Sequence, residues 1–271
     1  MSRKSPLLAA GIAIVAVGAL AALIGPWLTP FDPADQNLPL RLAAPTLSHP
    51  FGLDELGRDI LARVLAGARI SFLVGIVVVS ISSAVGTALG AVAGYFGGFW
   101  DDVISRTVDI LLAFPGLLLA IALVAVMGPS LGNVLFALTI IGWVGYARIV
   151  RGQALRAREF EYVQASRALG AGPLHVLVRH VIPAALPAVV VQATLGMAGA
   201  IIGEASLSFL GLGVQPPTPS WGNMLNGGRA HILDAPHLTI FPGLAIALLV
   251  LGFNFIGDGL RDATDPKKPR G

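Results

Sequence analysis

Six long apolar stretches constrain the fold of this chain of 271 residues more than any other feature of its sequence. A helix that crosses the hydrocarbon core of a membrane needs about 20 predominantly apolar residues. Each of the six stretches meets that length. We therefore predict an all-α, polytopic membrane protein whose six transmembrane helices cover residues 7–28, 70–95, 103–127, 131–150, 184–210 and 238–260.

The composition agrees with burial in lipid and excludes several classes of function. The chain is 55% hydrophobic and only 12% charged, whereas soluble proteins average about 25% charged residues. It contains no cysteine, which rules out disulfides, thiolate metal sites and cysteine nucleophiles. There is no basic patch with interleaved aromatic residues, so nucleic acid is not an expected partner. Membrane lipid is an expected partner because of the apolar composition.

The distribution of basic residues predicts the orientation of the spans, because cytoplasmic loops carry an excess of Lys and Arg. With a cytoplasmic N-terminus, 13 of the 18 basic residues lie inside and 5 lie outside. The inside group is Arg3, Lys4, Arg106, Arg148, Arg151, Arg156, Arg158, Arg167, Arg179, Arg261, Lys267, Lys268 and Arg270, and the outside group is Arg41, Arg58, Arg63, Arg69 and Arg229. We therefore predict a protein of the cell (inner) membrane with both termini, residues 1–6 and 268–271, in the cytoplasm.

Small residues indicate how some of the spans pack. Only residues 128–130 separate the third span from the fourth, which predicts a tight helical hairpin. In the second span Gly86, Gly90 and Gly94 recur every four residues on one face, a pattern that lets helix backbones approach closely. This face packs either within the subunit, which we favour, or against a partner subunit. Residues 19–21 also fit a signal-peptide cleavage site, but the apolar run continues beyond them, which favours a span.

The polar segment 151–180 is the only long connection on the predicted cytoplasmic side, and it reads as two short helices. In the first helix Tyr162, Ala165 and Leu169 share one face, and Gly170 interrupts the pattern. The segment could lie on the membrane as an amphipathic hairpin whose arginines bind anionic headgroups. Alternatively, it is a docking element for a soluble cytoplasmic partner.

The same segment resembles the EAA loop of ABC-importer permeases. That motif reads Glu-Ala-Ala, three residues, Gly, nine residues and Ile-x-Leu-Pro, and residues 164–170 and 180–183 keep its spacing. Three letters differ, because Gln164 replaces the Glu, Ser166 the second Ala and His180 the Ile. The first change removes a charge, and the acids nearest to it are Glu159 and Glu161.

Further stretches resemble the dipeptide, oligopeptide and nickel permeases within that class. Residues 49–59, HPFGLDELGRD, resemble the family's HPLGTDxLGRD box. Residues 204–213 and 216–222 match the signature in and after its fifth span, and residues 254–266 resemble its C-terminal end. In this order the motifs cover nearly the whole chain. The chain is therefore identified as a member of this family, as the C-type subunit of the permease pair.

The resemblance implies a single transmembrane permease domain, residues 7–267, with the ABC-importer permease fold and a coupling segment at 151–180. It also implies a second homologous permease subunit, two cytoplasmic ATPase subunits and an extracytoplasmic substrate-binding protein, which together import di- or oligopeptides, with nickel as another family substrate. The residues expected to couple to the ATPase are Glu161, Tyr162, Gln164, Ala165, Ser166, Arg167 and Gly170. The chain has no G-x-x-x-x-G-K-[ST] motif, so ATP and Mg are expected on the ATPases, and the chain itself is not catalytic and binds no cofactor.

Two acids fall within apolar runs, where an ionised carboxylate usually faces a partner or an aqueous cavity. We expect Asp109 to pair with Arg106, three residues before it on the same face. Glu204 either faces the translocation pathway, pairs with the partner permease or is protonated. The five histidines show no metal-ligand spacing, so no metal site is expected.

Other functions remain as alternatives. A proton-coupled secondary transporter or a channel is the main one, with Glu204 as its candidate proton relay. An intramembrane enzyme is disfavoured because the chain has neither H-E-x-x-H nor G-x-S-x-G. On the outside, segment 29–69 suits docking of a binding protein, or is a solvated loop in which Asp54 and Asp59 cap a short helix at 60–66.

Overall fold

In the computed structural model, which describes residues 6–264, the chain is a bundle of helices, and these residues form no β-strand. The helices are α1 (Pro6–Leu28), α2 (Ile60–Phe96), α3 (Gly98–Leu112), α4 (Gly116–Met127), α5 (Leu131–Ala157), α6 (Glu161–Ala168), α7 (Pro173–Val176), α8 (Ile182–Phe209), α9 (Trp221–Gly228) and α10 (His237–Thr264). Short 3-10 turns lie at Leu38–Leu40 and Arg229–His231, and a π-helical turn lies at Leu177–Val181. The predicted all-α class is confirmed.

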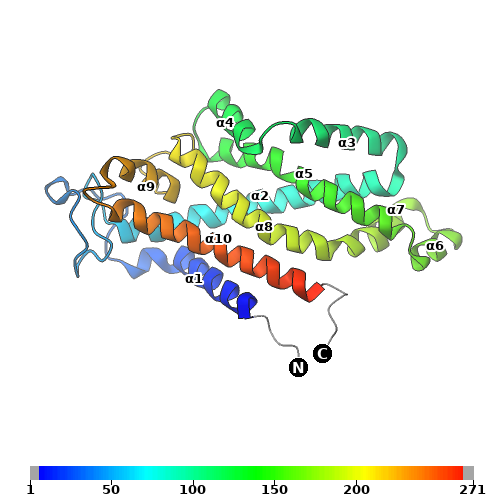
Figure 1. The fold of residues 1–271 in the computed structure, drawn as a ribbon, viewed down its shortest axis with the longest axis horizontal. Helices are drawn as coiled ribbons and strands as arrows, with labels where there is room; N and C mark the ends of the chain where they lie inside the picture. Colours follow the sequence, from blue (N-terminus) through cyan, green and yellow to red (C-terminus); the bar gives the residue numbers. More distant parts are fainter. Residues whose placement is uncertain (1–5, 265–271) are drawn as a thin grey trace.

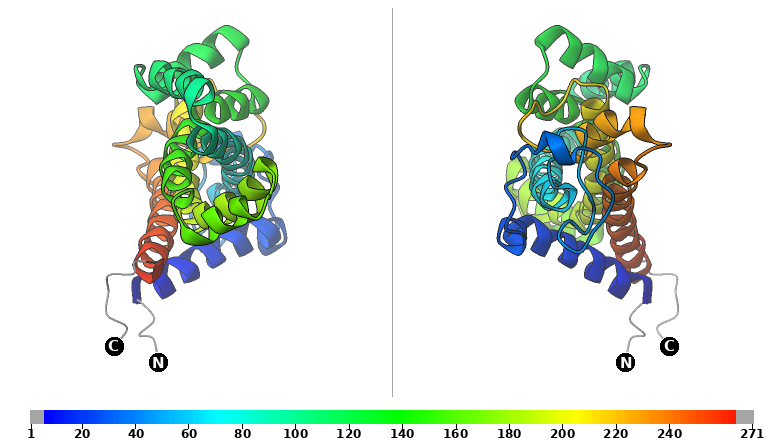
Figure 2. Two further views of the ribbon diagram at one scale, coloured as in Figure 1. Left: turned by 90° about the vertical axis from the view of Figure 1, so that its right-hand side faces the viewer. Right: turned by 90° about the vertical axis from the view of Figure 1, so that its left-hand side faces the viewer.

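The helices α2, α5 and α8 form the centre of the bundle, where each packs against the other two. The helices α1 and α10 pack together on one side, and α3 and α4 lie on the other (Figures 1 and 2). The segment between α1 and α2 closes one end of the bundle, together with α9 (Figure 1). The helices α6 and α7 lie at the opposite end, which we call the α6 end.

Five helices are long and apolar enough to cross a membrane, and they correspond to five of the six predicted spans. The third predicted span, 103–127, is wrong as a single helix, because α3 and α4 meet at an angle of 84°. Pro115 separates the two helices. A proline has no N–H to donate and disfavours a helical conformation in the residue before it, so the first helix ends there.

Two helices begin well before the predicted start of their spans. The helix α2 begins at Ile60, and residues 60–66, predicted as a separate short helix, are its first turns. The second short helix predicted in segment 151–180 is likewise not separate, because Pro173–Phe209 is one continuous apolar helix that contains α7, the π-helical turn and α8. The helix α5 also extends beyond residue 150, to Ala157.

The glycine face of α2 packs against α5 within the subunit, as favoured. A Cβ atom at Gly90 would lie 2.4 Å from the backbone oxygen of Ala147, and one at Gly94 would lie 2.5 Å from the backbone oxygen of Arg151. Gly86 is equally close to α5. These contacts bring the two backbones together, so no larger residue fits at this interface.

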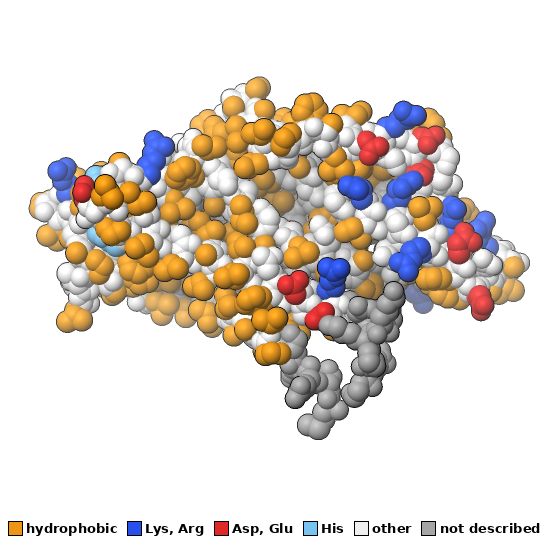
Figure 3. Space-filling model, viewed as in Figure 1, with side chains coloured by type: hydrophobic (Ala, Val, Ile, Leu, Met, Phe, Trp, Pro, Cys, Tyr) orange, Lys and Arg blue, Asp and Glu red, His pale blue; other side chains and the backbone are white. Residues whose placement is uncertain are grey.

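Charged side chains gather at the two ends of the molecule, and an apolar belt separates them (Figure 3). The first turn of α1 and the last turns of α10 lie side by side, since Leu8 is adjacent to Gly259. Arg261 of α10 and Gln153 of α5 line one cavity, so the last turns of α10 and the first turn of α1 lie toward the α6 end. The predicted terminal segments 1–6 and 268–271 lie outside the described residues, except for Pro6.

Alanine substitutions on α2 and α5 test the glycine interface. Gly90→Ala places a methyl group against the backbone of α5 and is expected to destabilise the protein by about 1–3 kcal/mol, the usual cost of overpacking. Gly152→Ala is the matched control, because open space surrounds Gly152 on α5. It is expected to be neutral or to stabilise by about 0.5–1 kcal/mol, since alanine is the better helix former. Thermal unfolding of the purified protein measures both, and equal effects of the two changes would contradict the interface.

Candidate functional site

The predicted coupling helix is present as α6, and one side of it is anchored in the bundle. Val163 is fully buried in a cluster with Ala157, Val176 and Val181, which belong to α5, α7 and the π-helical turn. The rest of the helix is held by few buried contacts. The helix α6 therefore packs, through Val163, on the end of α5 and on α7 and the π-helical turn that precede α8.

The other side of α6 faces outward. Tyr162 is 50% exposed and Leu169 is 89% exposed, and Ala165 is exposed between them. These are the three residues predicted to share a face. Of the seven predicted coupling residues, six are exposed and only Ser166 is partly buried; the exposed ones are Glu161, Tyr162, Gln164, Ala165, Arg167 and Gly170. An apolar surface on a helix at one end of the bundle suits a protein partner better than water.

Gly170 ends α6 in a conformation that other residues rarely adopt, with φ of +89°. The turn is closed by two backbone hydrogen bonds, because Gly170 N donates to Arg167 O at 3.0 Å and Ala171 N donates to Ser166 O at 3.1 Å. A Cβ atom at Gly170 would meet no neighbour. The need for glycine there is therefore conformational, not steric.

Two of the three departures from the EAA pattern contact each other. Ser166 Oγ and His180 Nε2 lie 3.2 Å apart, at hydrogen-bond distance. The ring of Tyr162 also packs edge-on against that of His180. The third departure, Gln164, donates from its side chain to Glu159 O at 3.3 Å. A polar pair thus joins α6 to the π-helical turn at two positions where the motif has apolar residues.

One of the two acids near Gln164 is already paired. Glu159 lies 3.1 Å from Arg158, its neighbour in the chain. Glu161 is exposed, and the ion pairs found among residues 6–264 do not include it. Glu161 is therefore the acid left on the outer face of α6.

Two cavities open along the helices that α6 touches. The first, of about 470 Å³, lies between α2, α5, α8 and the start of α4. The second, of about 480 Å³, lies between α5, α8 and the end of α10, nearer the α6 end. Gln192 and Leu195 line both. Gln192 was not among the predicted site residues, although a carboxamide inside an apolar stretch is a visible signal in the sequence.

Glu204 does not line either cavity. Its side chain is fully buried within the subunit, and Ser208 Oγ donates to Glu204 Oε1 at 2.6 Å. Ser208 Oγ also accepts from Val214 N at 3.3 Å, which ties the carboxylate to the turn after α8. Nothing in these contacts exposes Glu204 to the cavities, so its predicted place in the pathway rests on the sequence alone.

The ion pair expected between Arg106 and Asp109 is not among those formed by residues 6–264, and both residues are exposed. A different ion pair forms in this region, between Arg151 of α5 and Asp101 of α3. Arg151 Nη2 donates to Asp101 Oδ2 at 2.7 Å, and Arg151 Nε pairs with the other carboxylate oxygen. Bidentate geometry favours this partner. The pair joins the start of α3 to α5 near the α6 end.

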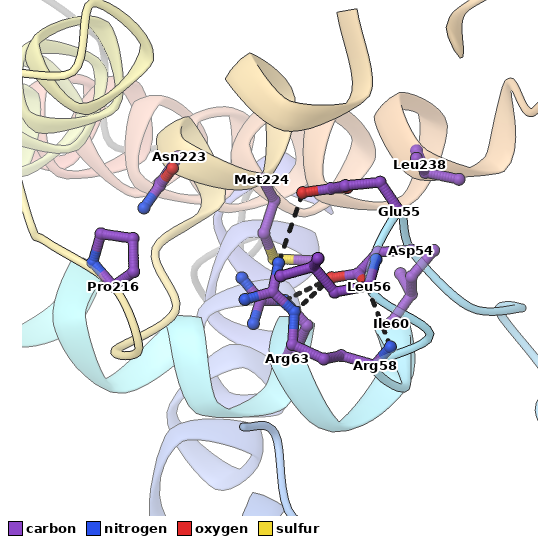
Figure 4. A pocket seen from close by; sticks show the side chains of 10 residues that line it. All are labelled: Asp54, Glu55, Leu56, Arg58, Ile60, Arg63, Pro216, Asn223, Met224 and Leu238. Atoms are coloured by element: carbon purple, nitrogen blue, oxygen red, sulfur yellow. Dashed lines mark hydrogen bonds and ion pairs between the residues drawn. The ribbon is translucent and has the colours of Figure 1, made fainter. Parts of the chain in front are cut away.

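The motif at 49–59 builds a rigid turn at the opposite end of the bundle (Figure 4). Arg58 Nε donates to Asp54 Oδ2 at 2.7 Å, and Arg63 Nε lies 3.4 Å from the same oxygen. As predicted, Asp59 caps a helix, accepting from Ala62 N at 2.7 Å, and the helix is α2 itself. Asp54 caps no helix, because it accepts from backbone N–H groups of its own turn.

Comparisons with known proteins identify the chain. Residues 86–269 match the family described as binding-protein-dependent transport system inner membrane component. The chain belongs to this family. Residues 3–45 match the N-terminal transmembrane domain of oligopeptide transport permease C, which confirms the predicted C-type subunit. The protein is therefore a multi-pass permease subunit of an ABC importer.

Individual relatives cover most of this permease. It is 46% identical over 252 residues to the glutathione transport system permease protein GsiD of Escherichia coli strain 536, covering 92% of this chain and 82% of the relative. It is also 46% identical over 265 residues to the dipeptide transport system permease protein DppC of Alkalihalophilus pseudofirmus, covering 98% and 87%.

A solved structure shares the fold. An inward-facing structure of the MetNI methionine ABC transporter matches with a TM-score of 0.56 and 21% identity. The match covers 76% of the permease and 96% of the MetNI chain. This likeness confirms the predicted permease fold.

A double-mutant cycle tests the contact between Ser166 and His180 in the permease. Ser166→Ala leaves the ring nitrogen without its partner and is expected to increase tryptic cleavage after exposed Arg167 about three- to tenfold, the effect of losing one hydrogen bond. Adding His180→Ile should restore slow cleavage, because the pair becomes apolar. His175→Ala, beside His180 but not bonded to Ser166, is the control. Cleavage that is unchanged in Ser166→Ala would show that the contact does not hold α6.

Proposed function

We propose that this permease forms half of the translocation pathway of an ATP-driven importer of di- or oligopeptides. The observation that carries the proposal is the connection between α6 and the cavities. The helix α6 rests through Val163 on α5 and on the helix that continues into α8, and α5 and α8 line both cavities. A force applied at the exposed face of α6 therefore reaches the walls of the pathway through packed helices.

Small peptides are the substrate class that the relatives support. The two relatives described above are named for dipeptide and glutathione transport, and glutathione is itself a short peptide. No group of three or more metal-ligating side chains occurs among residues 6–264, which gives no support to a bare metal ion as substrate. We therefore propose peptides, and not nickel, as the substrate.

The proposed assembly contains a second homologous permease, two cytoplasmic ATPases and an extracytoplasmic binding protein. ATP and Mg bind to the ATPases. The outward face of α6, with Tyr162, Ala165 and Leu169, enters a groove of the ATPase. Ligand binding shifts a conformational equilibrium only when the ligand prefers one state, and here ATP and the loaded binding protein together favour the outward-open state. The rigid turn at 49–59 supports the surface that meets the binding protein.

We also propose that both termini and α6 lie in the cytoplasm and that the segment between α1 and α2 lies outside. Single cysteines test this orientation, because the chain has no cysteine of its own. Leu47 is fully exposed in the segment before α2, and Leu169 is 89% exposed beside α6. A membrane-impermeant thiol reagent added to intact cells is expected to label Leu47→Cys, and to label Leu169→Cys only after the membrane is opened. The reverse pattern would invert the topology.

Valine substitutions at two glycines test the ATPase contact. Gly170→Val forces a β-branched residue into φ of +89° and should distort the end of α6. Gly172→Val is the matched control, because its φ is −64° and open space surrounds it. We expect pull-down of the tagged permease to recover a second permease and the ATPases from wild type and Gly172→Val, with at least tenfold less ATPase from Gly170→Val. Equal recovery from both variants would contradict docking through α6.

Glu204→Gln separates the importer from a proton-coupled transporter. Glutamine preserves the shape of the buried side chain and its acceptor for Ser208, so we expect ATP-dependent uptake within about twofold of wild type. A proton relay needs an ionisable group. Loss of uptake in Glu204→Gln with normal protein level, together with uptake driven by a pH gradient, would favour the alternative.

A further inference from the structure

The two cavities form one groove along α5 and α8. The lining residues of α8 recur every three or four positions, which places them on a single face of the helix. In the first cavity they are Gln192, Leu195, Gly196, Gly199, Ala200, Ile202, Gly203 and Ser206, and in the second they are Ala184, Pro187, Ala188, Val191, Gln192 and Leu195. The lining residues of α5 also recur every three or four positions and share one face of that helix; they include Leu138, Gly142, Tyr146, Ile149 and Gln153. Gln192 lies where the two cavities join.

The polar side chains of the first cavity differ in whether they already have a partner. Three are hydroxyls whose oxygen atoms donate to backbone oxygens of the same chain: Ser82 to Thr139, Tyr146 to Gln192 and Ser206 to Ile202. The fourth is the side chain of Gln192, and the hydrogen bonds found among residues 6–264 include none from its carboxamide. Its Nε2 lies near Gly145 of α5, with only 3.5 Å to the position of a Cβ there.

An unpaired carboxamide in the middle of a membrane-spanning helix is costly unless something else binds it. The group presents two donors and an acceptor, which is the complement of a peptide group. Hydrogen bonds to the main chain do not depend on the side chains of the ligand. Five glycines line the same cavity, at positions 116, 142, 196, 199 and 203, and they leave space beside Gln192.

We propose that the Gln192 carboxamide binds the main-chain amide of the transported peptide as it passes the junction of the two cavities. The proposal rests on peptide import as the proposed function. No charged side chain lines the first cavity among the described residues, so charge on the peptide is not matched there. The site takes short peptides through the group that all of them share.

Cysteine labelling tests whether the groove is the pathway. Gln192→Cys and the control Val190→Cys are made in this cysteine-free chain and assembled with the partner subunits in membrane vesicles. Val190 is on the same helix, is 50% exposed and lines neither cavity. A membrane-impermeant thiol reagent is expected to label Gln192→Cys at least tenfold faster than Val190→Cys. Equal rates, or no labelling of an active Gln192→Cys assembly, would mean that lipid or the partner permease fills the groove, and would overturn the proposal.

An N-methylated substrate tests the hydrogen bond itself. Uptake of dialanine is compared with uptake of its analogue methylated on the peptide nitrogen, which has no N–H to donate. The wild-type preference for dialanine should fall about three- to tenfold in Gln192→Ala, the share of one hydrogen bond, and should persist in Val190→Ala. Because the same binding protein serves all assemblies, its own selectivity cancels in the ratio. A change in protein level or folding alone would not alter this preference.

The outcomes separate the two proposals. A wild-type assembly that takes up no di- or tripeptide would contradict peptide import, while the labelling rates would still decide whether Gln192 faces an aqueous groove. A wild-type assembly that takes up dialanine, with the same preference over the methylated analogue in Gln192→Ala, would overturn the role of Gln192 alone.

Discussion

The structure depends on the close contact between the backbones of α2 and α5. Three glycines at four-residue spacing let α2 approach the carbonyl oxygens of α5, and the remaining elements are placed relative to this pair. Arg151, whose backbone oxygen makes the contact with Gly94, holds α3 through Asp101. Tyr146, opposite Gly86, reaches across to α8. A bundle in lipid gains little from hydrophobic burial between helices, so packing of this kind must hold it together.

The continuous helix from Pro173 to Phe209 connects α6 with the groove. Its first turns contact α6, its middle carries Gln192, and its last turns hold the buried Glu204. Packed cores tend to switch between discrete arrangements instead of deforming gradually. Movement of α6 by an ATPase would therefore move the wall of the groove as a unit, which is what alternating access requires.

The sequence predicts the positions of the spans well and their ends poorly, for physical reasons. Apolar length is a local property, so five spans were found. Residues 60–66 were predicted as a helix separate from the second span because Arg63 and Arg69 interrupt the apolar run. In the structure their guanidinium groups bind carbonyl oxygens of Pro33, Ala22 and Leu23, partners far away in sequence. The bend at Pro115 could have been predicted from the proline itself. The contact between Ser166 and His180 could not, because it depends on how α6 folds back.

Glu204 and Gln192 lie on different sides of α8, and of the two only Gln192 lines the cavities. An ionised group in a moving groove would lose and regain its hydrogen-bond partners in each cycle, and a buried polar group without a partner is costly. In this permease the carboxylate is fixed to the turn after α8 by Ser208, while the first cavity is lined by neutral side chains. A cavity with neutral walls can change shape at low electrostatic cost, and weak hydrogen bonds from Gln192 to a peptide main chain would let the substrate leave as readily as it enters.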